Sequence, residues 1–264
     1  MMREYRSDVL PNRNQGYSGR VTYDYASKYL VEFNFGYNGS ERLAAGHRFE
    51  FFPAVSAGWV ASSEKFWEPI SKYINHFKIR GSYGLVGSDA FASGAPPFLY
   101  QNNIGIGSAH NFWTGLPTSE ISKKGPGFYV LAVQDAGWEH VKKFDIGFDM
   151  MLFNQLNITF DYFHDKRERI LMSRASWPSM LGYWGSKPWS NIGEVENQGF
   201  ELSLNWTKQF GKDLTLDLRG NFTYNQNEYK YVDEPSYPYV WQTNTGKPLN
   251  TVCLLYTSPS PRDL

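Results

Sequence analysis

Several features that mark other classes of protein are scarce or missing in this sequence. Cys253 is the only cysteine among 264 residues, so neither a disulfide framework nor a cysteine-based metal site is expected. No apolar run approaches the roughly 18 residues that a transmembrane helix needs. The N-terminal segment MMREYRSDVLPNRNQ lacks the apolar region of a signal peptide. We therefore expect either a cytosolic protein or a piece of a longer chain that starts upstream.

Net charge is also missing. Lys plus Arg and Asp plus Glu both number 26, which gives no electrostatic reason to expect a nucleic-acid partner. The five histidines are scattered without the close His or Cys partners of a metal site. His164 lies near Asp161 and Asp165, but a charged strand end explains these three residues better than a catalytic cluster. We expect no enzyme activity, no cofactor and no bound metal.

Aromatic residues, in contrast, are abundant at 17%, and many of them alternate with polar residues. Segment 199–224 contains two alternating stretches joined at Gly211-Lys212. A period of two predicts strands, and the short link containing glycine predicts a hairpin. Further alternating or strand-like segments bring the expected number of strands to about eight; they are 20–25, 29–38, 51–62, 77–85, 143–152 and 156–162.

The connections between these expected strands alternate in length. They are short near Ser27, Asn154 and Gly211, of medium length at 63–76, where a short helical turn is expected, and long elsewhere, at 39–50, 87–137, 169–196 and 229–249. Membrane β-barrels have short turns at one end and long loops at the other. We therefore expect loops 87–137 and 169–196 at the same end, and favour a membrane barrel. A soluble β-sandwich or propeller is the alternative.

Long phrases of the sequence carry a family resemblance. They are RNQGYSGRVTYDYASKYLVEFNFGYNGSERLAAGHRFEFFPAVSAGWVAS, FKIRGSYGLVGSD, KKFDIGFDMMLFNQLNITFDYFHDKRERIL and NIGEVENQGFELSLNWT. Over about residues 12–250 they closely resemble the barrel of the SusC/RagA family of TonB-dependent outer-membrane receptors. The resemblance implies an all-β fold: a partial transmembrane antiparallel β-barrel, with about eight strands of a larger plugged barrel of about 22 and long extracellular loops.

The resemblance also implies a function at the cell outer membrane. Such receptors import nutrients such as oligosaccharides or peptides, and a SusD-like surface lipoprotein closes over the barrel as a lid. Outer-membrane lipid would surround the wall. The TonB-ExbB-ExbD system would act through N-terminal parts, including a plug and a TonB box, that are missing here. The alternative function is a soluble extracellular β-protein that binds or degrades carbohydrate.

The end of the sequence differs from the rest. The stretch CLLYTSPSPRD (253–263) resembles no barrel strand, and it can be written in codons that resemble a transposon-based sequencing adapter. We expect residues 1–252 to be the partial barrel domain. Residues 253–264 are expected to be an adapter-derived tail.

Aromatic residues in the long loops are the candidate binding residues. Loop 174–193 carries four of them, and HNFWTG (110–115) carries one more. Their flat apolar faces suit sugar rings or the surface of a partner protein. The alternative is that they pack within their own loops or lie at the lipid interface. The candidates are Trp113, Trp177, Tyr183, Trp184 and Trp189.

Overall fold

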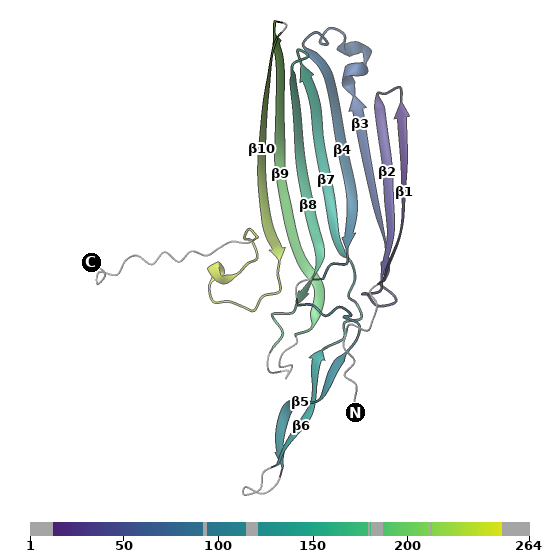
Figure 1. The fold of residues 1–264 in the computed structure, drawn as a ribbon. Coiled ribbons are helices and arrows are strands. Elements are labelled where there is room, and N and C mark those ends of the chain that lie inside the picture. The colour runs from purple at the N-terminus through teal and green to yellow at the C-terminus, as the bar shows by residue number, and fades with distance from the viewer. Residues whose placement is uncertain are drawn as a thin grey trace, which may run out of the picture.

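One antiparallel sheet of eight strands dominates the computed structural model (Figure 1). The strand order is β1-β2-β3-β4-β7-β8-β9-β10, so neighbours in the sheet follow one another along the chain except at the step from β4 to β7. The sheet is not closed, because β1 and β10 do not pair with each other. This confirms the prediction of an all-β, partial barrel. The structure describes residues 13–91, 94–114, 121–178, 180, 187–211 and 213–249.

The strands of this sheet differ in length. The shortest have 12 residues and β9 has 22. The bounds are β1 Asn14–Tyr25, β2 Tyr29–Ser40, β3 Phe49–Val60, β4 Ile74–Ser88, β7 Glu139–Leu152, β8 Leu156–Ser173, β9 Trp189–Phe210 and β10 Leu214–Tyr231.

The described helical elements are three short 3₁₀ turns. Two of them, η2 (Ala61–Ser63) and η3 (Lys65–Trp67), lie where the sequence predicts a helical turn, and η5 (Val240–Gln242) follows β10. Within the described ranges, no helix has the length and apolar composition needed to cross a membrane.

Successive connections lie alternately at the two ends of the sheet, and the medium-length connection 61–73 shares its end with the short hairpins (Figure 1). Tight hairpins at 26–28 and 153–155, with left-handed φ near 54° at Ser27 and Asn154, close one end, which we call the turn end. Connections 41–48, 89–138, 174–188 and the segment after β10 lie at the opposite end, the loop end. The prediction that loops 87–137 and 169–196 share an end is confirmed.

Both of those predicted loops contain strand residues that the sequence analysis missed. Strands β5 (Asn103–Thr114) and β6 (Ile121–Val130) form a separate hairpin, which projects from the loop end (Figure 1). Strand β8 runs on to Ser173 and β9 begins at Trp189, which reduces the predicted loop 169–196 to residues 174–188. The extra part of β8 reads HDKRERILMS, with charge on both faces, so it shows no apolar alternation although its backbone still pairs with β9.

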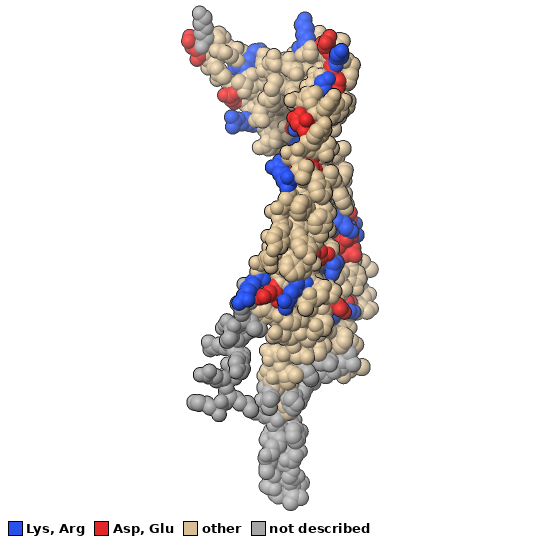
Figure 2. All heavy atoms as spheres, turned by 90° about the vertical axis from the view of Figure 1, so that its right-hand side faces the viewer, with Lys and Arg blue, Asp and Glu red and all other residues tan. Residues whose placement is uncertain are grey.

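The two faces of the large sheet differ in polarity, as the alternation predicts. Paired residues share a face, and rows such as Phe160–Leu202–Phe222 and Tyr162–Phe200–Tyr224 cross three strands on the apolar face. Figure 2 shows an uncharged band at mid-height, with charged side chains gathered toward both ends and along one edge. In the part of the chain that is described, no second sheet covers the apolar face, because the other sheet is the β5–β6 hairpin at the loop end. This arrangement argues against a soluble sandwich.

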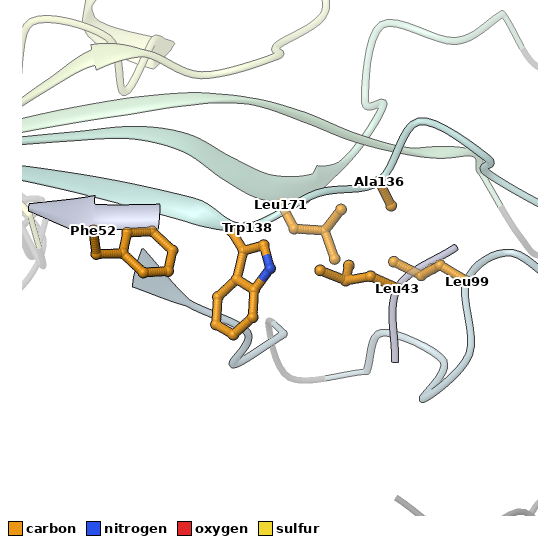
Figure 3. Packing of buried hydrophobic residues seen from close by; sticks show 6 residues of the cluster. All are labelled: Leu43, Phe52, Leu99, Ala136, Trp138 and Leu171. Atoms are coloured by element: carbon orange, nitrogen blue, oxygen red, sulfur yellow. The ribbon is translucent and has the colours of Figure 1, made fainter. Parts of the chain in front are cut away.

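The buried core lies at the loop end (Figure 3). Phe52 packs edge-on against Trp138 with ring centroids 5.4 Å apart, and the Trp138 indole N–H donates to the carbonyl oxygen of Arg48 at 3.0 Å. A Cβ atom on Gly87 would lie 2.0 Å from the Phe52 ring, so glycine is needed where this ring packs. The cluster joins strand ends to loops, and its buried members are Leu43, Phe52, Leu99, Ala136, Trp138 and Leu171.

After its loop, the chain returns along the free edge of β10. The backbone N–H of Tyr229 donates to Lys247 O at 3.0 Å, and Gly246 N donates to Tyr229 O at 2.8 Å. Leu249 N donates to the side chain of Asn227 at 2.7 Å. These bonds hold residues 246–249 against the edge of β10. Residues 250–264, which include the predicted adapter-derived tail, lie outside the described residues.

Candidate functional site

A charged cluster centred on Arg80 occupies the polar face of the sheet. The guanidinium lies 2.7 Å from Asp161, 3.3 Å from Asp149 and 3.7 Å from Asp145. Strands β4, β7 and β8 supply these residues, and Gly147 leaves room for them because a Cβ there would lie 2.0 Å from Asp161 Oδ1. One guanidinium among three carboxylates leaves two formal negative charges in this cluster.

An open cavity of about 570 Å³ lies beside this cluster on the polar face. Acidic and basic side chains both line this cavity, which suits contact with water or with a polar protein segment rather than with lipid. The charged residues that line it are Asp24, Glu32, Lys78, Arg80 and Asp145.

The aromatic candidates of loops 110–115 and 174–193 are only partly described. Trp189 is the first residue of β9, lies opposite Ser173 and packs partly against the buried cluster. Trp177 is half-buried in the turn after β8. The backbone of Trp113 lies in β5, but its side chain is outside the described part, as are residues Tyr183 and Trp184. The structure therefore places Trp177 and Trp189 at the loop end and does not place all five candidates on one surface.

Asp233 joins two segments of the loop end, a role that the sequence analysis missed. Its side chain is only 4% exposed. It accepts hydrogen bonds from the backbone N–H of Ser176 at 3.0 Å and the Ser176 hydroxyl at 2.8 Å, and Arg174 Nε lies at 3.3 Å. Burial alone would raise the pKa of the Asp233 carboxyl, but Ser176 and Arg174 outweigh it and hold the pKa below its usual range. We call these three residues the Asp233 latch.

Exposed aromatic residues after β10 were also missed. Tyr237, Tyr239, Val240 and Trp241 follow the Asp233 latch and are all exposed. The sequence analysis treated 229–249 only as a long loop, although the letters YPYVW were a usable signal because exposed Tyr and Trp are typical of binding surfaces.

His164 and Asp161 do not form a catalytic cluster, but the interpretation of a charged strand end was wrong, because β8 continues past both residues to Ser173. The strand alternation places them on opposite faces. His164 pairs with Glu196, and Asp161 pairs with Arg80. Among the described residues, no group of three His, Cys, Asp or Glu side chains is placed to hold a metal ion.

Comparison with known proteins gives consistent matches. The family model "TonB dependent receptor-like, beta-barrel" matches residues 5–262. The chain is 31% identical over 211 residues to "TonB-dependent receptor P3" of Formosa agariphila, which covers 80% of this chain and 20% of that protein. It is 26% identical over 239 residues to "TonB-dependent receptor SusC" of Bacteroides thetaiotaomicron, which covers 86% and 22% of the two chains.

A solved structure shares the fold. The RagAB peptide importer in the "open-open" state superposes with a TM-score of 0.68 and 20% identity, over 84% of this chain and 22% of that chain. The chain thus spans about a fifth of the length of the relatives that it matches.

Proposed function

The chain belongs to the TonB-dependent receptor family of β-barrels, of the SusC/RagA type, and on this premise we propose that it forms part of the wall of an outer-membrane nutrient transporter. The observation that carries the proposal is the difference in polarity between the two faces of the sheet. Lipid covers the apolar face, and the polar face with its Arg80 cluster lines the interior of the barrel. The loop end faces the outside of the cell, because long loops of such barrels are extracellular.

The proposed cargo is an oligosaccharide or a peptide. SusC-type and RagA-type relatives support the class of transporter, and the printed title of the RagAB structure describes a peptide importer. A SusD-like surface lipoprotein is the proposed partner at the loop end. The TonB-ExbB-ExbD system is the proposed source of energy and acts through parts of the receptor outside this segment.

The candidate aromatics are proposed to contact cargo or lipoprotein. Trp177 and Trp189 support this role by lying at the loop end. Trp113, Tyr183 and Trp184 belong to the same loops and are retained as proposed contacts. Replacement of Trp177, Trp184 and Trp189 by alanine in the full-length receptor is expected to weaken binding by about 1–2 kcal/mol for each buried anchor. Unchanged uptake and unchanged recovery of the lipoprotein would remove these residues from the binding surface.

The proposal is tested with the full-length receptor that contains this segment. Deletion of its gene should abolish uptake of one class of nutrient, and the purified receptor should require detergent for extraction. It should also change gel mobility on heating, as closed barrels do when they unfold. A chain that is released in buffer without detergent and that binds or cleaves glycan would instead support the soluble carbohydrate-binding or carbohydrate-degrading alternative.

A further inference from the structure

The connection from β3 to β4 exposes large apolar side chains at the turn end (Figure 1). Its residues 64–74 form helical turns, because backbone N–H groups there donate to carbonyl oxygens three or four residues earlier. Phe66 is 59% exposed, Ile70 41% and Tyr73 55%. Their spacing of four and then three residues places the three side chains on one side of the turns. We call residues 64–74 the 64–74 segment.

The 64–74 segment is folded onto the apolar face of the sheet. Trp67 stacks on Phe77, with ring centroids 5.3 Å apart and planes 6° from parallel. Phe77 lies on the apolar face, because it alternates with Ile79, which belongs to the row of paired residues from Trp59 to Phe160. The segment therefore lies against the side of the wall that is proposed to face lipid, and not against the polar face.

Further contacts fix the height of the segment along the wall. The ring of Phe66 lies 6.3 Å from that of Trp59, at the end of β3. The backbone N–H of Phe153 donates to Tyr73 O at 3.0 Å, and the two rings meet edge-on at 6.1 Å. Phe153 belongs to the tight hairpin 153–155, so the segment is held level with the hairpins that close the turn end.

The position and chemistry of the segment favour lipid as its partner. Its exposed apolar side chains continue the apolar face to which Trp67 is packed. Lys65, Glu68 and Lys72 are exposed on the same turns. Interfacial segments of this kind bury an apolar side among acyl chains and leave charged groups among the lipid headgroups. A protein partner on this side would have to displace the lipid that covers the neighbouring wall.

We propose that the 64–74 segment is a membrane-interface anchor at the turn end. Phe66, Ile70 and Tyr73 insert at the boundary of the hydrocarbon layer, and the charged side chains of the same turns lie among the headgroups. This inference rests on the proposed function, which places the apolar face in lipid. Aromatic girdles of barrels flank the apolar band of the wall; here a connection between strands adds a lateral foot that widens the contact of β3 and β4 with the membrane.

The test measures the depth of spin labels in the full-length receptor, reconstituted in liposomes of phosphatidylethanolamine and phosphatidylglycerol. Single cysteines are introduced into a cysteine-free receptor, and collisions are compared between oxygen, which concentrates in lipid, and a nickel chelate, which stays in water. The label of Ile70→Cys is expected to favour oxygen, as is that of Leu204→Cys on the apolar face. The matched control is Glu68→Cys, on the charged side of the same turns, which is expected to favour the nickel chelate.

Several results would overturn the anchor. If Leu204→Cys reports lipid while Ile70→Cys reports water, the anchor is wrong and the proposed function stands. If Leu204→Cys itself reports water, the apolar face does not meet lipid and the proposed function fails as well. A label on Ile70→Cys that is shielded from both probes would show that protein covers the segment. Equal preference for oxygen at positions 68 and 70 would exclude an interfacial position.

The labelled receptors must be folded for these comparisons. Heat-modifiable gel mobility equal to wild type establishes this for each variant. Tyr73→Cys replaces Ile70→Cys if the latter does not fold, and its label is expected to favour oxygen in the same way, because Tyr73 lies on the same side of the turns.

Discussion

The first prediction concerns Leu204, which lies near the centre of the apolar face. The outward apolar residues of β10 run from Leu214 to Tyr224, about 34 Å along the strand at about 3.4 Å per residue. With a strand tilt of about 40°, this length corresponds to about 26 Å of height, close to the roughly 25 Å apolar band of an outer-membrane barrel. Leu204 pairs with Ile158 and Gly220, near the middle of that band.

Leu204→Arg in the full-length receptor should therefore destabilise it by about 2–4 kcal/mol, because the guanidinium would face hydrocarbon at the bilayer midplane. Ser203→Arg is the matched control, since Ser203 is at the same depth but faces Thr159 and Asn221 on the polar side. Its cost should be about 1 kcal/mol or less, as for an exposed substitution. The free energy of unfolding is measured by denaturant titration of the receptor in liposomes. Equal costs for the two variants, or a larger cost for Ser203→Arg, would refute the assignment of the faces.

Two further predictions concern the loop end. Gly87→Ala should cost about 1–3 kcal/mol in the same titration, because the new methyl group would collide with the buried Phe52 ring; Gly220→Ala, with open space around it, should have little effect, and equal effects would contradict this explanation. Because the pKa of Asp233 is lower in the folded state, its contribution is complete above the unfolded value of about 3.9 and is lost as the pH falls through the folded value. In wild type, hydrogen exchange at 232–249, corrected for intrinsic rates, should therefore rise only below about pH 3.9. In Asp233→Asn, exchange of the same residues should already be raised at neutral pH. An identical pH profile for the two proteins would rule out the latch.

The wall of the barrel was predictable from the sequence, and the reason is local. Alternation along segments such as 199–224 predicts both the strands and the faces, because a side-chain period of two is a property of the strand itself. The order of the connections predicts which loops share an end, since an antiparallel meander returns every second connection to the same side. The SusC/RagA resemblance supplied the size of the complete barrel.

The loop end was less predictable, because its structure depends on contacts between distant segments. Strands β5 and β6 were read as loop, and the outer part of β8 carries charge on both faces and so hides its strand character. Nothing around Asp233 in the sequence indicates a partner, since Ser176 is 57 residues away. The exposed rings of Tyr237, Tyr239 and Trp241 were not predicted, because the candidate aromatics lay in loops 110–115 and 174–193.

The length of β9 has a mechanical consequence. Its outward apolar residues occupy the part from Phe200 to Phe210, and the part from Trp189 to Gly199 continues beyond them, still paired with β8 over most of its length and with β10 along the part nearest the apolar band. At about 3.4 Å per residue and a tilt of about 40°, the part of β9 from Trp189 to Gly199 extends about 29 Å beyond the apolar band, toward the loop end. A hydrogen-bonded ribbon of this height bends far less than a loop of the same length. A force applied at the loop end of β9 is therefore transmitted to the membrane-spanning part of the sheet through paired strands and not through a flexible loop.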